Sequence, residues 1–113
     1  MHELTLAEHA LRIVEKTAKK AEAVRVTRIK LAIGVLAHVD PETLQYCCEM
    51  VSRGTLAEGA RIEIVRSPGL AHCDDCMQEV ELKQVGEPCP RCGSYRLDIT
   101  DGDQMLVLDI GIA

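Results

Sequence analysis

The sequence predicts an α+β fold, in which two helices pack on a three-stranded sheet and a four-cysteine module is inserted before the last strand. Two segments repeat apolar residues at helical spacing, and three alternate them with polar ones, as half-buried strands do. Two Cys-x-x-Cys pairs, twelve residues apart, stand before the last of these strands. Because that strand returns after the cysteines, we expect residues 1–69 and 98–113 to form one domain and residues 70–97 to form the module.

The first helix is predicted from Thr5 to about Ala23. Thr5 and Glu8 fit a capping box, in which a hydroxyl and a carboxylate satisfy the free N–H groups of a helix start, and a start nearer Glu3 is the alternative. The predicted buried face recurs at helical spacing and consists of Leu4, Ala7, Leu11, Val14, Ala18 and Ala21.

A strand is predicted from Val24 to Gly34, and a second helix begins at Asp40-Pro41, with Asp as N-cap and Pro at the first helical position. Arg53 and Gly54 end this helix. On the strand, Thr27, Ile29, Leu31 and Ile33 alternate with Arg28, Lys30 and Ala32. The buried stripe of the second helix consists of Leu44, Cys47, Cys48 and Val51.

Two more strands complete the predicted sheet. The strand over residues 60–66 turns Ile62 and Ile64 inward and is broken by Ser67-Pro68-Gly69. The last strand, over residues 104–112, carries four apolar residues on one face: Leu106, Leu108, Ile110 and Ile112. We expect the helices to cover the sheet and bury these apolar faces.

Composition excludes several classes of function. The 113 residues carry a net charge of −5 and include no Trp or Phe, which argues against binding to a nucleic-acid backbone or to stacked bases. Apolar runs are too short for a membrane span, and the start of the chain lacks the features of a signal peptide. Together with the paired cysteines, this points to a reducing cytoplasm and metal thiolates.

The two cysteine pairs predict a structural zinc site in a zinc-ribbon-like module. Each tight turn aims two thiolates at one metal, and a closed four-thiolate site leaves no open position for chemistry. Gly93 suits the turn after the second pair, and Met77 suits the first less well. The alternative is a redox dithiol. The four predicted ligands are Cys73, Cys76, Cys89 and Cys92.

The remaining cysteines and histidines favour structural interpretations. Cys47 and Cys48 are adjacent on a helix and point in different directions, so we expect burial as small apolar residues. His9 and His38 have no ligand at suitable spacing. His72 precedes Cys73 and is interpreted as a solvated loop residue, with zinc ligation as the alternative. Acidic residues form no convincing catalytic pair, so we expect no enzyme.

Met1-His2 offers a second possible metal site. The free amine, an amide nitrogen and the imidazole can close adjacent chelate rings in the nitrogen-rich, square-planar field that Ni(II) and Cu(II) favour. Glu3 adds an amide and a carboxylate. The alternative is that Met-His occurs here by chance. In that case the chain is a zinc-ribbon adaptor that binds another protein and has no nickel site.

The whole chain resembles the HypA/HybF family of nickel metallochaperones for [NiFe]-hydrogenase maturation. The resemblance rests on Met1-His2-Glu3-Leu4, the first helix, the strand at Val26-Thr27-Arg28-Ile29, the Arg53-Gly54-Thr55 turn and the paired cysteines. It implies that Ni(II) is carried by Met1, His2 and Glu3, with His2 indispensable, and that the four-cysteine zinc is structural. It also implies two partners, the nickel-handling GTPase HypB and the [NiFe]-hydrogenase large subunit, and for some members a role with urease.

This chain departs from some relatives at one place. Those relatives carry histidines just after the cysteine pairs, where this chain has Met77 and Gly93. An exchange of histidine for cysteine on zinc is therefore not expected. The resemblance implies a carrier and not a catalyst.

Overall fold

The computed structural model describes residues 3–113 and divides them into two compact units. The helical unit takes in residues up to Ala32 together with residues 39–65 and 105–113. The cysteine unit takes in residues 33–38 and 66–104. The second unit extends beyond residues 70–97 on both sides and also includes residues 33–38.

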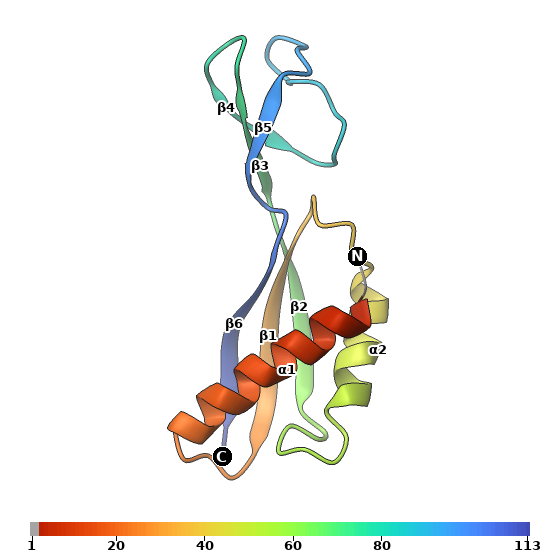
Figure 1. The fold of residues 1–113 in the computed structure, drawn as a ribbon, viewed down its shortest axis with the longest axis vertical. Coiled ribbons are helices and arrows are strands. Elements are labelled where there is room, and N and C mark those ends of the chain that lie inside the picture. The colour runs from red at the N-terminus through yellow and green to blue at the C-terminus, as the bar shows by residue number, and fades with distance from the viewer. Residues whose placement is uncertain (1–2) are drawn as a thin grey trace. The chain divides into compact units, whose positions relative to one another are not determined.

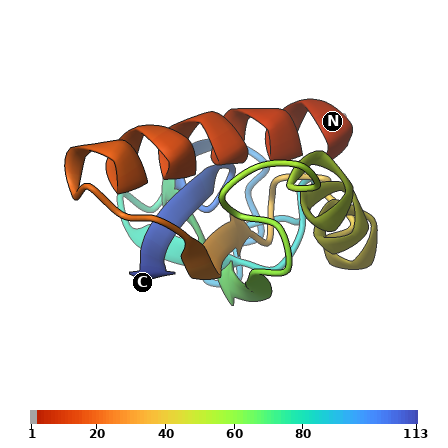
Figure 2. The same ribbon diagram turned by 90° about the horizontal axis from the view of Figure 1, so that it is seen from below.

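Two helices form one layer of the helical unit. Helix α1 spans Glu3–Lys20 and helix α2 spans Pro41–Val51, and α1 packs against α2 and against strand β6, Met105–Ile112 (Figures 1 and 2). The buried face of α1 is made of small residues, which let it approach its neighbours closely: Ala7, Ala10, Val14 and Ala18. None of the helices in the described part of the chain is long and apolar enough to cross a membrane.

Both ends of α1 differ from the prediction. The helix already begins at Glu3, so Thr5 lies inside its first turn and the predicted capping box is wrong. At the other end Glu22 takes a left-handed φ of 55°. The Ala23 N–H then donates to the Ala18 carbonyl at 2.9 Å and the Glu22 N–H to the Lys19 carbonyl at 3.1 Å, as in a Schellman motif. Leu4 and Ala21, both expected on the buried face, are exposed.

Helix α2 follows the prediction more closely. Asp40 is the N-cap and Pro41 the first helical residue, while Asp40 uses its carboxylate to accept a hydrogen bond of 2.6 Å from Thr43 Oγ1. Cys47 and Cys48 are buried, as predicted for small apolar residues. Helix α2 therefore buries its cysteines against the core.

The first sheet has the strand order β2-β1-β6, with β1 at Val26–Gly34 and β2 at Arg61–Ser67 (Figure 1). Ile29, Leu31 and Ile33 of β1 are buried, whereas Thr27 is exposed. Two helices on this three-stranded sheet, with a four-cysteine cluster inserted before β6, confirm the predicted fold class.

The expected burial of the last strand is wrong. Leu106 and Leu108 are 53% and 51% exposed, and Ile112 is exposed as well. Strand β6 lies at the edge of its sheet and has a neighbouring strand on one side only. Leu106, Leu108 and Ile112 share one face of β6, and an alternation pattern identifies such a face without showing whether anything covers it.

The cysteine unit contains a second sheet, which the sequence did not predict. Its order is β4-β3-β5, with β3 at Gly69–Cys73, β4 at Glu79–Leu82 and β5 at Leu97–Asp101. Both outer strands run antiparallel to β3. The core of this unit is assembled from alternate residues on one face of β3 and β4, from two cysteines and from one residue outside the sheet: Leu36, Ala71, Cys73, Val80, Leu82 and Cys89.

Backbone segments cross closely within the cysteine unit at two glycines. A Cβ on Gly34 would stand 1.9 Å from the Gly102 carbonyl oxygen, and Gly102 itself has a left-handed φ of 87°. Around this point the Gly34 N–H donates to the Gln104 carbonyl and the Leu36 N–H to the Gly102 carbonyl. Only glycine fits this crossing at position 34.

Candidate metal centre

Two matching turns position the four cysteines. The Cys73 N–H donates to the Gln78 carbonyl and the Met77 N–H to the Cys73 carbonyl, both at 2.9 Å. The second turn repeats this pattern, from Cys89 N–H to the Ser94 carbonyl and from Gly93 N–H to the Cys89 carbonyl. Met77 adopts the same left-handed conformation as Gly93, with φ of 56° and 77°. The first turn therefore closes without a glycine.

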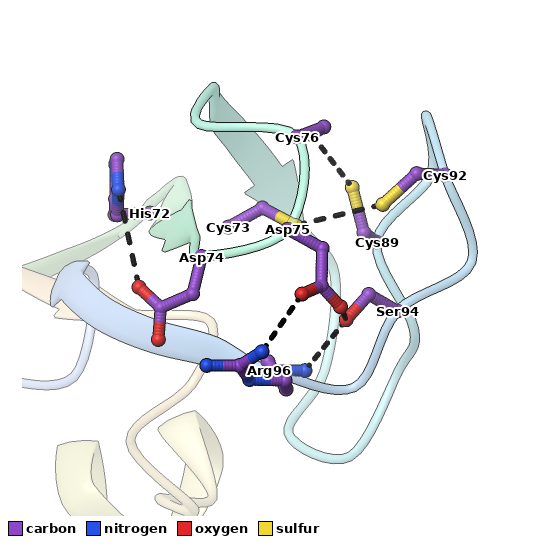
Figure 3. Close-up of polar contacts among 9 residues, drawn as sticks. All are labelled: His72, Cys73, Asp74, Asp75, Cys76, Cys89, Cys92, Ser94 and Arg96. Atoms are coloured by element: carbon purple, nitrogen blue, oxygen red, sulfur yellow. Dashed lines mark hydrogen bonds and ion pairs between the residues drawn. The ribbon is translucent and has the colours of Figure 1, made fainter.

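The four sulfur atoms converge on one point between the turns (Figure 3). They all lie within 4.8 Å of one another, and two pairs that cross between the turns, Cys73–Cys92 and Cys76–Cys89, are 3.6 Å and 3.8 Å apart. A tetrahedral ion with metal–sulfur bonds of about 2.3 Å requires sulfur separations of about 3.8 Å. The donor set and its spacing therefore fit zinc.

As thiols, these cysteines differ in acidity. Burial and hydrogen bonds with the other three thiols raise the pKa of Cys76 to about 12. Burial also acts to raise the pKa of Cys89, but hydrogen bonds from the Cys92 and Arg91 N–H groups outweigh it and bring that pKa to about 7. A first thiolate forms readily, and further ones need a cation to balance their charge.

A polar network joins the two turns outside the sulfur cluster. The Asp75 carboxylate accepts a hydrogen bond from Ser94 Oγ and forms a 3.0 Å ion pair with Arg96 (Figure 3). The Asp74 N–H donates to the Arg96 carbonyl at 2.9 Å. The segment after the second cysteine pair is thus tied to the residues inside the first pair.

His72 belongs to strand β3, where it pairs with Glu79 on β4 and with Asp98 on β5. Its Nε2 lies 3.9 Å from an Asp74 carboxylate oxygen, and its side chain is partly exposed. The group that could hold a metal within residues 3–113 comprises the four cysteines without His72. The expected loop histidine is therefore a strand residue beside the cluster.

The structure describes only one of the three predicted nickel residues. Met1 and His2 lie outside it, and Glu3 is its first residue. Glu3 Oε2 accepts a hydrogen bond of 3.2 Å from the Asp40 N–H, which connects the start of α1 to the N-cap of α2. The cysteines belong to the other unit, so the two predicted metal sites do not share residues.

Two features of these sites were missed in the sequence. Asp40 was predicted only as a helix cap, and no local pattern connects it with Glu3. The Asp75, Ser94 and Arg96 network was also missed, although Asp75 lies inside one cysteine pair and Ser94 two residues after the other. The signal available in the sequence was the equal internal spacing of the two cysteine pairs, which predicts two similar turns.

Comparison with known proteins points to one family. The family model described as "Hydrogenase/urease nickel incorporation, metallochaperone, hypA" matches residues 1–112. A hydrogenase maturation factor HypA 2 from Bradyrhizobium diazoefficiens is 46% identical over 112 residues, which cover 99% of both chains. A hydrogenase maturation factor HypA from Azotobacter chroococcum is 45% identical over the same share of both chains.

Solved structures show the same fold. The solution structure of the Ni metallochaperone HypA from Helicobacter pylori aligns with a TM-score of 0.76 over 99% of this chain and 97% of its own, at 24% identity. A second solution structure, of a HypA protein, aligns with a TM-score of 0.71 over 100% of this chain and 97% of its own, at 25% identity. The chain that carries the four-cysteine cluster therefore has the same fold as these two solved structures.

Proposed function

Because the chain belongs to the HypA family of hydrogenase and urease nickel-incorporation metallochaperones, we propose that it binds Ni(II) at its N-terminus and delivers it during [NiFe]-hydrogenase maturation. The match of the family model over residues 1–112 is the observation that carries this proposal. The chain acts as a carrier, and no reaction is assigned to it.

The proposed nickel ligands are Met1, His2 and Glu3. The terminal amine, the backbone amides and the His2 imidazole supply the nitrogen donors that suit Ni(II). The bond from the Asp40 N–H to the Glu3 carboxylate supports the proposal, because it holds the side chain that follows His2 in a defined place. A carrier must also release its ion, and a micromolar site, worth about 8 kcal/mol, is compatible with transfer.

The proposed role of the four cysteines is structural. Cys73, Cys76, Cys89 and Cys92 would hold zinc, which binds four thiolates and leaves no position for a substrate. When bound, the ion would supply positive charge that partly balances the negative charge of the four thiolates. The chain's own contribution is the pair of turns that places the sulfur atoms, with the N–H groups around Cys89 favouring its thiolate.

The proposed partners are the GTPase HypB, which handles nickel, and the hydrogenase large subunit, which receives it. We place this activity in the cytoplasm, because four thiolates persist as metal ligands where thiols stay reduced. The rival function is a zinc-ribbon adaptor, which has zinc and a protein partner but no nickel site.

Nickel affinity should fall as the pH falls. Binding displaces protons from an amine with an ordinary pKa of about 7.7–8.0 and from an imidazole with one of about 6.5. Calorimetric titration of untagged protein with Ni(II) at mildly acid and mildly basic pH measures this change. Acetylation of the N-terminus should weaken binding at both values. Equal affinity at the two pH values, or in the acetylated chain, would contradict ligation by the amine and the imidazole, whereas absence of nickel binding would favour the adaptor.

A further inference from the structure

An apolar hollow opens on the surface of the cysteine unit, and none of the four cysteines lines it. Its volume is about 130 Å³. Three of its lining side chains are exposed, with Tyr95 73% and Val85 46% accessible. Exposed apolar side chains that gather around a hollow typically mark a site of interaction. The residues that define this Tyr95 groove are Leu82, Val85, Glu87, Tyr95, Leu97 and Ile99.

The groove is built on rigid elements. Leu82 is on β4, and Leu97 and Ile99 are on β5, the two strands that flank β3. Leu97 pairs with Cys73 in the sheet. Tyr95 stands between Ser94 and Arg96, which Asp75 fixes from the first cysteine turn. The wall of the groove formed by Tyr95 and Leu97 is therefore held by the same turns that position the sulfur atoms.

A second hollow extends the groove. It has a volume of about 250 Å³, shares Leu82 and Glu87 with the first, and continues past Pro88 and Pro90. Glu87 Oε1 accepts hydrogen bonds from the Lys83 and Gln84 N–H groups at 2.7 Å and 2.8 Å, which fixes this carboxylate between the hollows. A chain segment could therefore lie along both hollows and meet a fixed negative charge between them.

The net charge of the cysteine unit indicates which kind of partner the groove can bind. Its residues include eight Asp and Glu against four Lys and Arg, so this unit carries −4 of the chain's net charge of −5. A four-thiolate zinc site adds two further negative charges. The helical unit is close to neutral, which makes a second copy of this chain a poor electrostatic match for the groove.

We infer that the Tyr95 groove docks a partner-protein segment with an aliphatic anchor residue flanked by Lys or Arg. The anchor fills the hollow over Leu82 and Leu97, Tyr95 covers it, and the basic residues meet Glu87 and Glu81, which outnumber Lys83 in the lining of the two hollows. Tyrosine at the edge of a preformed hollow is a common centre of binding energy. This inference rests on the proposed zinc site, because zinc holds the turns that build the groove.

A designed peptide tests the inference directly. The probe is the acetylated, amidated peptide Gly-Lys-Lys-Leu-Leu-Lys-Lys-Gly, titrated into untagged, zinc-loaded, ¹⁵N-labelled full-length protein. The amide signals of Val85, Tyr95 and Ile99 should shift together. Replacing the peptide lysines by glutamates, or its leucines by serines, should abolish these shifts.

Two tyrosine variants supply the decisive comparison. Tyr95→Ser should raise the dissociation constant of the lysine peptide at least about tenfold, whereas Tyr46→Ser, which removes an exposed tyrosine of α2, should change it less than about twofold. Zinc and nickel per chain are measured on the same samples. Loss of zinc in Tyr95→Ser would be a folding defect, and Ile99→Ser, at the other wall, then takes its place with the same expectation.

Several results would overturn the inference. These are equal binding by the tyrosine variants, equal binding by the glutamate peptide, shifts confined to the exposed face of β6, or no shift at millimolar peptide. Shifts of the groove signals on concentrating the protein alone would assign the groove to a second copy. A chain that carries zinc and nickel but fails these tests defeats only the docking site, whereas a chain without zinc defeats the proposed metal site.

Discussion

Cysteine side chains have two different surroundings in this protein. Cys47 and Cys48 are packed in α2 among apolar neighbours, and the other four meet at one point between two turns. Burial favours the neutral thiol of Cys48 in α2, whereas between the turns the Cys92 and Arg91 N–H groups favour the thiolate of Cys89. The same side chain therefore serves as a core residue in one place and as a prospective metal ligand in the other.

Cys48 should make stability depend on alkaline pH. Burial, with smaller contributions from Cys47 and Glu49, raises the pKa of Cys48 from 9.0 to about 11. A raised folded-state pKa stabilises the fold fully below pH 9 and loses that contribution as the pH rises to about 11, by up to about 2 kcal/mol. In urea unfolding, Cys48→Ala should therefore lose less stability between about pH 8 and pH 11 than the wild type.

Cys47→Ala is the matched control for this prediction, because it removes the adjacent buried thiol of the same helix. It should keep most of the wild-type dependence on pH. Cys48→Ala is expected to cost some packing energy at every pH, so the comparison is of slopes. A wild-type slope in Cys48→Ala would show that another group titrates.

For single residues, the sequence was sufficient to predict the four sulfur donors but not the side chains that surround them. The spacing of the cysteine pairs was sufficient to group Cys73, Cys76, Cys89 and Cys92, since two short turns bring the four sulfur atoms within 4.8 Å of one another. Asp75 and Arg96 are far apart in the chain and follow no spacing rule, so their ion pair required the fold. The meeting of Glu3 with Asp40 depended in the same way on the packing of two helices.

Among the elements, long periodic segments were predictable and short or irregular ones were not. Both helices and the strands of the first sheet follow from their apolar periods. Strand β5, at Leu97–Asp101, alternates apolar and polar residues only from Leu97 to Thr100, which is too short a run to identify a strand by itself, and its place is set by pairing with β3. The end of α1 escaped prediction because Glu22, rather than a glycine, takes the left-handed position.

Gly34→Ala should strongly destabilise the cysteine unit. Its Cβ would lie 1.9 Å from the Gly102 carbonyl oxygen, so backbone must move and the bonds at Gly34 and Leu36 would weaken. We expect a cost above about 3 kcal/mol, in the range of the most severe single substitutions. Thermal unfolding, followed by circular dichroism, measures it.

Gly59→Ala is the control for the glycine prediction. Gly59 has a left-handed φ of 77° but open space around its Cβ position, so alanine there meets backbone strain alone, about 1–2 kcal/mol. Equal melting temperatures for the two variants would contradict the close crossing at Gly34.

Cys73→Ser should remove zinc and disorder the cysteine turns. Cys73 is fully buried, pairs with Leu97 in the sheet, and contributes one of the four sulfurs, so a serine there leaves three thiolates and a buried hydroxyl. Elemental analysis and amide spectra measure the two effects. Cys47→Ser, with its sulfur outside the cluster, should keep one zinc per chain. Retention of full zinc in Cys73→Ser would refute the four-thiolate site.

In the molecule as a whole, the two proposed metal sites draw on different units. Glu3 opens α1 in the helical unit, and the cysteines belong to the unit with the second sheet. Each unit has its own core and its own three-stranded sheet, so damage to one site need not remove the other. We therefore expect that mutations can remove the proposed nickel site without the proposed zinc site, which a protein with one shared centre would not allow.

The most direct test measures nickel and zinc per chain on untagged wild type, His2→Ala and His9→Ala. His9 is exposed on α1 and controls for the loss of a histidine near the N-terminus. The proposed function predicts one nickel and one zinc in the wild type and in His9→Ala, and zinc without stoichiometric nickel in His2→Ala. An unchanged nickel isotherm in His2→Ala would contradict it.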